Sequence, residues 1–138
     1  MERQVLVPDR IFDSVAGVMR EGLAVIIEDD RIEQVVPSGA LAEEEPLVDL
    51  AGYTLLPGLI DVHTHLATPL YDGQGFAQVG QRNAAQDALI GVKHAAETLA
   101  AGFTTVRDIG PWRAFVDVAL KEAIEAGWVG GPRMACAG

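Results

Sequence analysis

The sequence GLIDVHTHL, residues 58–66, holds two of the chain's three histidines, separated by a single residue. The apolar, partly β-branched residues before them favour a short strand. Because side chains alternate between the two faces of a strand, Asp61, His63 and His65 are expected on one face. The other face, expected to pack beneath helices, is formed by Ile60, Val62, Thr64 and Leu66.

On spacing alone, two interpretations of the histidine pair stay open. In the first, His63 and His65 bind a metal ion, because imidazole is a good ligand for zinc, iron and nickel. In the second, they are polar residues at a strand end that form hydrogen bonds with their neighbours. Asp61 either orients a histidine ligand without binding the metal itself or binds a nearby backbone group, and the second role is favoured.

The pattern of the sequence changes near Pro57. Before it, short apolar runs separated by turn residues predict β-structure, with strands at 4–8 and 46–57. Residues 23–37 are β-branched on both sides of the aspartates at 29–30, which favours a hairpin. We therefore expect a first domain at residues 1–56 that is built from strands.

After Pro57, strands and helices alternate, which defines a second expected domain at 57–138. Strands are expected at 59–66, 103–109 and 132–138, and single helices between them imply parallel units with right-handed crossovers. Three strands are too few for a closed barrel, which needs eight. The fold class is α/β.

Apolar periodicity predicts the two helices. In residues 83–101 apolar side chains recur at helical spacing, and Gly102 occupies the position of a helix C′ glycine. Pro111 suits the first turn of the next helix, which ends at Gly127. The periodic positions are Ala85, Leu89, Val92, Ala96 and Leu99 in the first helix, and Val116, Ala119, Leu120, Ala123 and Ile124 in the second.

Composition excludes several classes of protein. The 138 residues carry a formal net charge of -10, and a nucleic-acid surface needs clustered Lys and Arg. No apolar stretch approaches the roughly 18 residues of a membrane span, and the first residues lack a signal-peptide core. We therefore expect a cytoplasmic protein without a nucleic-acid or membrane partner. Its one cysteine, Cys136, is expected to be a small buried residue rather than a nucleophile.

The stretch TLLPGLIDVHTHL at 54–66 resembles the first barrel strand of the amidohydrolase superfamily, whose signature is Pro-Gly-Leu-Ile-Asp-x-His-x-His. GLAVIIEDDRIEQVVP at 22–37 and VDLAGYTLLPG at 48–58 resemble the N-terminal β-sandwich segment of those enzymes. LAAGFTTVRDIG at 99–110 and GPRMACAG at 131–138 resemble the second and third strands of the branch related to imidazolonepropionases and prolidase-like peptidases.

This resemblance implies part of a composite β-sandwich at residues 1–56. The first three strands of an incomplete, metal-dependent (β/α)8 TIM-like barrel would follow at 57–138. It implies that His63 and His65 bind a divalent transition metal, with zinc expected and one or two ions in the intact enzyme. It also implies hydrolysis of a C–N amide or peptide bond by a metal-activated hydroxide. Substrates would be small molecules or peptides, such as a dipeptide, an N-acyl amino acid or a cyclic amide.

The same resemblance places the family's remaining ligands and its acid on later strands. Lys93 and Lys121 are expected on helix surfaces, and His94 lies within a helix and is not expected to be a ligand. No catalytic or further cofactor-binding residue is assigned. The expected partners are therefore a missing C-terminal part of the same protein and, in a homo-oligomer, a second copy. Two alternatives remain, a catalytically incomplete fragment and a non-catalytic structural or binding module.

Two further features have two interpretations each. Arg107 and Asp108 either face the mouth of the site or pair internally, and internal pairing is favoured. The segment 67–81 either contacts substrate or is an ordinary loop.

Overall fold

The computed structural model describes residues 2–42, 44–68, 77 and 80–138. The chain divides into two compact units, the first ending at Pro57 and the second spanning Gly58–Gly138. Sheets occur in both units and α-helices in the second, which confirms the expected α/β class. None of the helices in the described ranges is long and apolar enough to cross a membrane.

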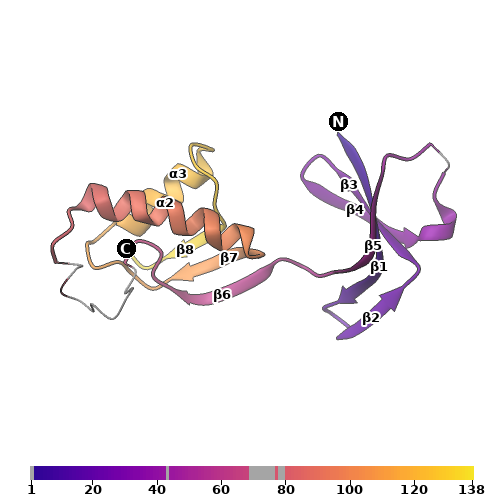
Figure 1. The fold of residues 1–138 in the computed structure, drawn as a ribbon, viewed down its shortest axis with the longest axis horizontal. Helices are drawn as coiled ribbons and strands as arrows, with labels where there is room; N and C mark the ends of the chain where they lie inside the picture. Colours follow the sequence, from indigo (N-terminus) through magenta and orange to yellow (C-terminus); the bar gives the residue numbers. More distant parts are fainter. Residues whose placement is uncertain (1, 43, 69–76, 78–79) are drawn as a thin grey trace. The chain divides into compact units, whose positions relative to one another are not determined.

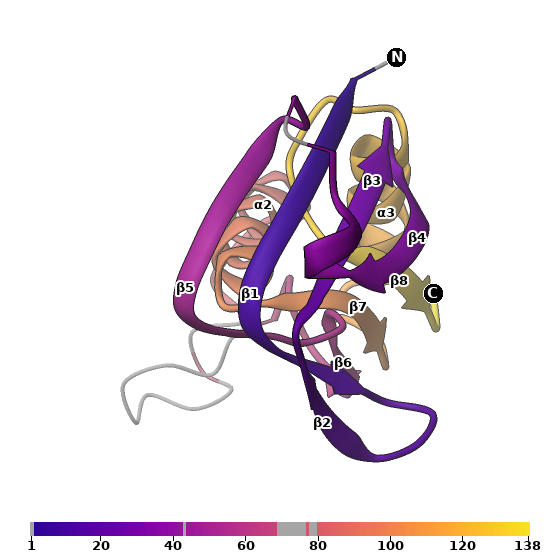
Figure 2. The same cartoon turned by 90° about the vertical axis from the view of Figure 1, so that its right-hand side faces the viewer.

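The first unit is a sheet of five strands arranged around its first strand (Figure 2). β1 pairs antiparallel with β2 and β3 and parallel with β5, and β4 continues the sheet beyond β3. A short 3-10 helix, η1, precedes the last strand. The bounds are β1 Arg3–Asp13, β2 Val18–Glu21, β3 Leu23–Glu28, β4 Arg31–Pro37, η1 Ser38–Ala40 and β5 Leu47–Leu55.

The predicted hairpin is confirmed, because β3 and β4 pair antiparallel around a tight turn. Asp29 occupies the left-handed region of that turn with a φ of 53°, which aspartate tolerates better than most residues. Strand β2 was not predicted, because all four of its residues are exposed and leave no apolar alternation to detect. Its pairing with β1 also extends that strand to Asp13, beyond the predicted end at residue 8.

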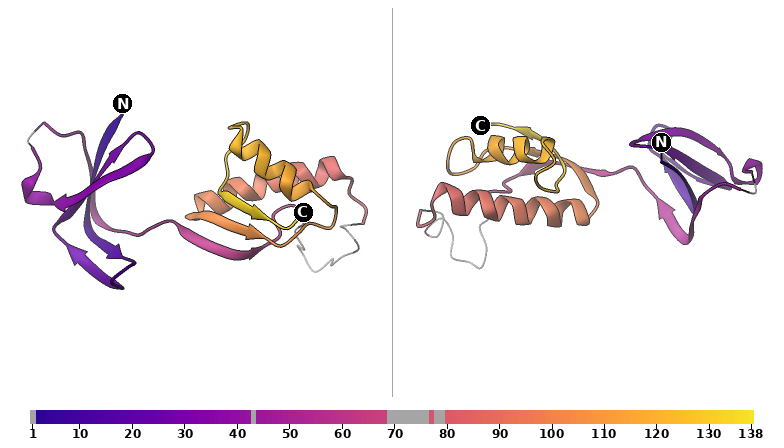
Figure 3. Two further views of the ribbon diagram at one scale, coloured as in Figure 1. Left: turned by 180° about the vertical axis from the view of Figure 1, so that it is seen from behind. Right: turned by 90° about the horizontal axis from the view of Figure 1, so that it is seen from above.

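In the described part of the second unit, three parallel strands pair in the order β6-β7-β8 and are connected through two helices. Both helices lie on the same side of this sheet (Figures 1 and 3). The predicted alternation of strands and helices is confirmed. The bounds are β6 Leu59–Thr64, α2 Ala84–Ala100, β7 Phe103–Asp108, α3 Val116–Glu125 and β8 Arg133–Cys136.

The helix ends follow their local sequence, with one correction. Asn83 caps α2 in a reciprocal capping box with Gln86, and Gly102 follows the helix with a φ of 93°. The prediction that Pro111 begins the next helix is wrong, because α3 begins at Val116. The residues before Val116 instead make long-range contacts, such as the hydrogen bond from the Trp112 amide to the Thr68 hydroxyl.

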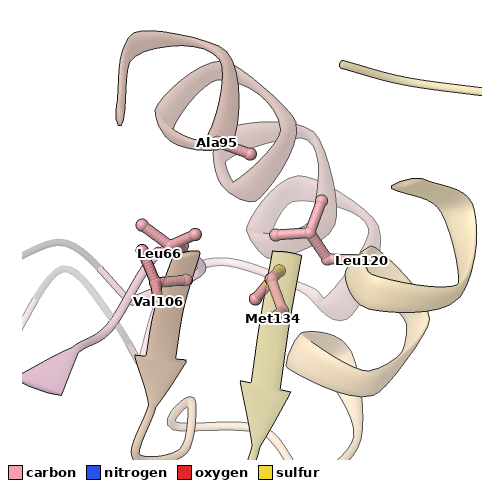
Figure 4. Close-up of a cluster of buried hydrophobic side chains, with 5 residues drawn as sticks. All are labelled: Leu66, Ala95, Val106, Leu120 and Met134. Atoms are coloured by element: carbon pink, nitrogen blue, oxygen red, sulfur yellow. The ribbon is translucent and has the colours of Figure 1, made fainter. Parts of the chain in front are cut away.

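A small apolar core lies between the sheet and the helices of the second unit (Figure 4). It is formed by Leu66, Ala95, Val106, Leu120 and Met134. The buried face of α2 differs from its periodic apolar positions, since Leu89 is 72% exposed and Gly91 is buried. A Cβ at Gly91 would lie 3.1 Å from Leu120 Cδ2, so glycine permits the close approach of α3.

Candidate metal centre

The two histidines lie at the carboxyl end of strand β6. His63 is within the strand, and His65 follows its last residue, Thr64. Both side chains are exposed, and the centroids of their rings are 5.6 Å apart in an edge-on arrangement. The two imidazoles therefore lie close enough to share one bound group.

The ring of His65 is oriented by the loop that follows β7. Its Nδ1 lies 2.7 Å from the carbonyl oxygen of Gly110. Because a carbonyl oxygen can only accept a hydrogen bond, Nδ1 carries the proton. The neutral ring then presents the lone pair of Nε2, which is the form that binds a metal ion.

Asp61 acts on the backbone beside His63. Its Oδ1 accepts a hydrogen bond of 3.0 Å from the amide of His63. The favoured role of Asp61, binding a nearby backbone group, is therefore confirmed. The contact fixes the backbone from which the His63 side chain projects.

The prediction that side chains alternate strictly between the two faces of β6 is wrong. The pairing with β7 shifts register between Asp61 and Thr64. Asp61, Thr64 and His65 all line one cavity beside His94 of α2, so residues from both expected faces of β6 meet at it. Of the face expected to pack beneath helices, Leu66 is buried, but Ile60 and Val62 are 65% and 59% exposed.

Asp108, the last residue of β7, is 1% exposed and accepts two backbone hydrogen bonds. Its Oδ2 receives the amide of Leu66 at 2.7 Å, and its Oδ1 receives the amide of Gly110 at 3.1 Å. Burial raises the pKa of this carboxyl group above its ordinary value, against the lowering effect of the two amides.

Internal pairing of Arg107 and Asp108 is confirmed, but the partners are backbone groups rather than each other. The guanidinium Nε of Arg107 donates a hydrogen bond of 2.8 Å to the carbonyl oxygen of Val62. Arg107 and Asp108 together therefore join the ends of β6 and β7. The proposed substrate loop at 67–81 falls largely on residues outside those that the structure describes.

His94 and the lysines lie where the sequence placed them. His94 is buried within α2, and its Nδ1 lies 2.8 Å from the carbonyl oxygen of Leu66. Lys93 pairs with Glu97 at 2.7 Å on the surface of the same helix, which lowers the pKa of Glu97. Lys121 pairs with Glu125 at 3.8 Å along α3.

Cys136 is half-buried in β8, and its Sγ donates to the carbonyl oxygen of Asp117 at 3.4 Å. Burial is the largest cause that raises the pKa of its thiol, to about 11. A thiol of that pKa is almost entirely protonated at neutral pH. This agrees with the expected structural role rather than with a nucleophile.

A buried ion cluster at the start of α2 was missed in the sequence. Asp87 is 1% exposed and lies 2.9 Å from Arg82 Nε and 3.1 Å from Arg113 Nε. The guanidinium of Arg113 also donates to the carbonyl oxygen of Arg82. Acidic residues are common in the first turn of an exposed helix. The local sequence therefore did not show that Asp87 is buried.

The donor set is compatible with a metal ion but incomplete. Within the described ranges, no group of three or more His, Cys, Asp or Glu side chains could hold an ion. His63 and His65 are two suitable nitrogen donors, and His65 has its ring oriented by Gly110. A catalytic zinc ion normally takes three protein ligands, so these two residues fit as part of a set.

The model of the amidohydrolase family matches residues 54–138. The dihydroorotase of Mycobacterium tuberculosis is 35% identical over 71 residues, which are 51% of this chain and 16% of that protein. The imidazolonepropionase of an Arthrobacter species is 49% identical over 43 residues, 31% of this chain and 11% of that protein.

A solved structure of a Xaa-Pro dipeptidase with methionine bound in its active site superposes with a TM-score of 0.86 at 27% identity. The match covers 99% of this chain and 33% of the dipeptidase chain. The chain therefore spans about a third of the length of that protein and less of its curated relatives. The chain belongs to the amidohydrolase family, and the expected resemblance to imidazolonepropionases and prolidase-like enzymes is confirmed.

Proposed function

We propose that His63 and His65 are two ligands of a divalent transition metal, expected to be zinc, in a metal-dependent amidohydrolase. The enzyme would hydrolyse the C–N bond of an amide or peptide. The hydrogen bond between His65 Nδ1 and the Gly110 carbonyl carries this proposal, because it leaves Nε2 free to coordinate an ion. Membership of the family and the likeness to a Xaa-Pro dipeptidase support the same class of reaction.

We propose that β6, β7 and β8 are the first three strands of a (β/α)8 barrel. The parallel pairing of the strands and the helices on one side of the sheet support this assignment. In such a barrel the active site lies at the carboxyl ends of the strands, which is the end that carries His63 and His65. The N-terminal sheet would belong to a β-sandwich.

When bound, such an ion acts as a Lewis acid that lowers the pKa of water and polarises an amide carbonyl. The residues of this chain have simpler tasks. His63 and His65 bind through their ring nitrogens, and the Gly110 carbonyl keeps the proton of His65 on Nδ1. Asp61 holds the backbone of His63 in place. The remaining ligands and the proton-transferring acid would come from a longer chain.

The test uses the longer protein that contains the later strands. We expect elemental analysis to find at least one transition-metal ion per chain in the wild type. The double variant His63→Ala with His65→Ala should lose both the metal and the hydrolysis of a panel of Xaa-Pro dipeptides, N-acyl amino acids and cyclic amides. Wild-type metal content and rate in the double variant would refute the proposal.

His94→Asn provides a matched control. It removes another histidine near the same strand, and its amide nitrogen can still donate to the Leu66 carbonyl. We expect this variant to retain the wild-type metal content. Loss of the metal in His94→Asn would contradict the assignment of the ligand pair.

The substrate is proposed to be a small molecule or a short peptide. A further part of a longer protein is proposed to be the partner that completes the site. A homo-oligomer and a location in the cytoplasm stay predictions, to be checked by light scattering and by fractionation of cells that produce the protein. The alternative of a catalytically incomplete fragment predicts that residues 1–138 alone show no hydrolysis.

A further inference from the structure

The carboxylate of Asp108 accepts hydrogen bonds from two backbone amides that lie near His65. The two oxygens of Asp108 accept the amide of Leu66, the residue directly after His65, and the amide of Gly110. The carbonyl of that same Gly110 contacts the His65 ring. Asp108 thus forms hydrogen bonds with the backbone after His65 and with the backbone of the loop that contacts its ring.

Gly110 needs such an anchor because its backbone is unusual. Its φ of 112° is strained for most other residues. Because glycine adopts many backbone conformations, contacts with other residues must hold the loop in this one. The amide of Gly110 is held by Asp108, and this places the peptide group directly before the one that contains the Gly110 carbonyl. Further along the loop, the amide of Trp112 donates to Thr68, close to Leu66 in the chain.

We propose that Asp108 is a positioning residue for the metal centre, which makes His65 present Nε2 by holding Gly110 and Leu66 around its ring. The inference rests on the proposed metal site. Groups that orient metal-binding histidines through their second nitrogen affect metal affinity by about 10- to 100-fold. Here the group that contacts the ring is the carbonyl of Gly110, and Asp108 binds the amide of that same residue.

A merely structural role is the competing explanation, because any buried carboxylate is expected to need its hydrogen bonds. Asp117 makes the distinction possible. It is 0% exposed in the same unit and likewise accepts backbone amides, from Val118 at 2.9 Å and from Gly138 at 3.1 Å. These two amides lie in α3 and after β8, outside the segments beside His65. Asp117→Asn is therefore a matched control.

The experiment compares Asp108→Asn with Asp117→Asn in the longer protein. Asparagine keeps one acceptor oxygen but turns an NH2 group toward the second backbone amide, so one of the two hydrogen bonds is lost. Zinc affinity is measured by competition with a chelator. The tautomer of His65 is measured in metal-free protein by long-range 1H–15N NMR, at a pH where the imidazole is neutral.

We expect wild type to hold His65 with the proton on Nδ1. Asp108→Asn should lose this preference and bind zinc about 10- to 100-fold more weakly, whereas Asp117→Asn should match wild type in both. Equal effects of the two variants would overturn the proposal, and so would an unchanged tautomer in Asp108→Asn. Should Asp108→Asn fail to fold, Asp108→Glu, which displaces both oxygens by one methylene, takes its place with the same expectations.

The two measurements separate this inference from the proposed function. The tautomer is read without metal, so it tests the link from Asp108 to His65 even if His63 and His65 bind no ion. A tautomer that depends on Asp108, in a protein whose zinc does not depend on His63 and His65, would support the positioning link and refute the metal site. An Asp108→Asn variant with altered tautomer and unchanged zinc affinity at the pair would overturn the positioning role in metal binding.

Discussion

The two units of the chain bury different kinds of side chain. In the described part of the first unit, the buried residues are apolar, and Val5, Ala24 and Ile26 form their cluster. The second unit buries an apolar cluster together with several polar residues, which are Thr68, Asp87, His94, Asp108 and Asp117. Burial of a polar group destabilises a protein unless its hydrogen bonds are satisfied. The second unit uses such groups to hold the loops that follow its strands.

Charged side chains in the first unit lie nearer the solvent. Arg3 pairs with Glu45 at 2.9 Å, and Arg20 pairs with Asp13 at 2.8 Å. Pairs of this kind contribute little to stability because water screens them. The comparison therefore predicts that substitution of the buried acids of the second unit is damaging and that substitution of the ion pairs of the first unit is mild.

Asp87→Ala should have the largest effect on stability. The change leaves the guanidinium groups of Arg82 and Arg113 together without the buried carboxylate between them. Removal of one partner from a buried ion cluster destabilises by about 3–5 kcal/mol. Urea unfolding of the protein, followed by hydrogen exchange in peptides of the second unit, measures this loss.

The control for Asp87→Ala is Asp30→Ala in the first unit. Asp30 and Arg31 form an ion pair at 3.8 Å with side chains that are 87% and 84% exposed. This variant should unfold at the wild-type urea concentration. Equal destabilisation by the two substitutions would break the comparison between the units.

Leu120→Ala should have the next largest effect. Leu120 is 3% exposed and lies in the core between the helices and the sheet (Figure 4). The cavity and the lost burial should destabilise the second unit by about 3 kcal/mol. Leu89→Ala in α2 is the matched control, because Leu89 is 72% exposed and its truncation should change stability by less than about 0.5 kcal/mol. A similar loss in both variants would show that Leu89 is covered.

The order of elements in the second unit could be predicted because each strand and helix has its own local signal. The β-branched run at Phe103–Asp108 and the glycine at 102 are examples. Positions decided by distant contacts could not be predicted. The start of α3 is displaced from Pro111 to Val116, in a segment whose Arg113 pairs with Asp87 in another helix.

For the candidate site, the sequence indicated the histidine pair and a hydrogen bond of Asp61 to a nearby backbone group, which is the His63 amide in the structure. It did not identify the orientation of His65, because the Gly110 carbonyl lies on a different strand connection. It also placed Ile60 and Val62 beneath helices, since alternation assumes an unbroken register that β6 does not keep. Local pattern thus located the donors, and tertiary contacts determined their orientation.

Asn83→Ala should have a smaller effect than the core substitution. The Asn83 side chain accepts the amide of Gln86, and this hydrogen bond is lost in alanine. The backbone amide of residue 83 can still donate to the Gln86 side chain. Loss of such a cap destabilises by about 1 kcal/mol. Thermal unfolding measures the change, and Asn83→Ser, which can still accept the amide, should restore most of it. No difference between Ala and Ser would contradict the cap.

The smallest expected effect is an opposite pH dependence of the two units. In the first, a backbone amide and the Arg20 side chain lower the pKa of Asp13, and Arg3 lowers that of Glu45. Their stabilising contribution is present above the ordinary carboxyl pKa and is lost as pH falls through the lowered values. Burial raises the pKa of Asp108, so its contribution is present at low pH and is lost as pH rises through the raised value.

Acidification below the ordinary carboxyl pKa should therefore weaken the first unit, whereas acidification through the raised pKa of Asp108 should relieve the cost of its ionisation in the second. NMR titration of the carboxyl carbons gives the three pKa values directly, and hydrogen exchange at each pH, corrected for intrinsic rates, gives the stability of each unit. In Asp13→Asn with Glu45→Gln, the acid loss of the first unit should be reduced, and the response of the second should be unchanged. A pKa of Asp108 below that of an ordinary aspartate would mean that its two amide hydrogen bonds outweigh its burial, and the expected contrast between the units would then disappear.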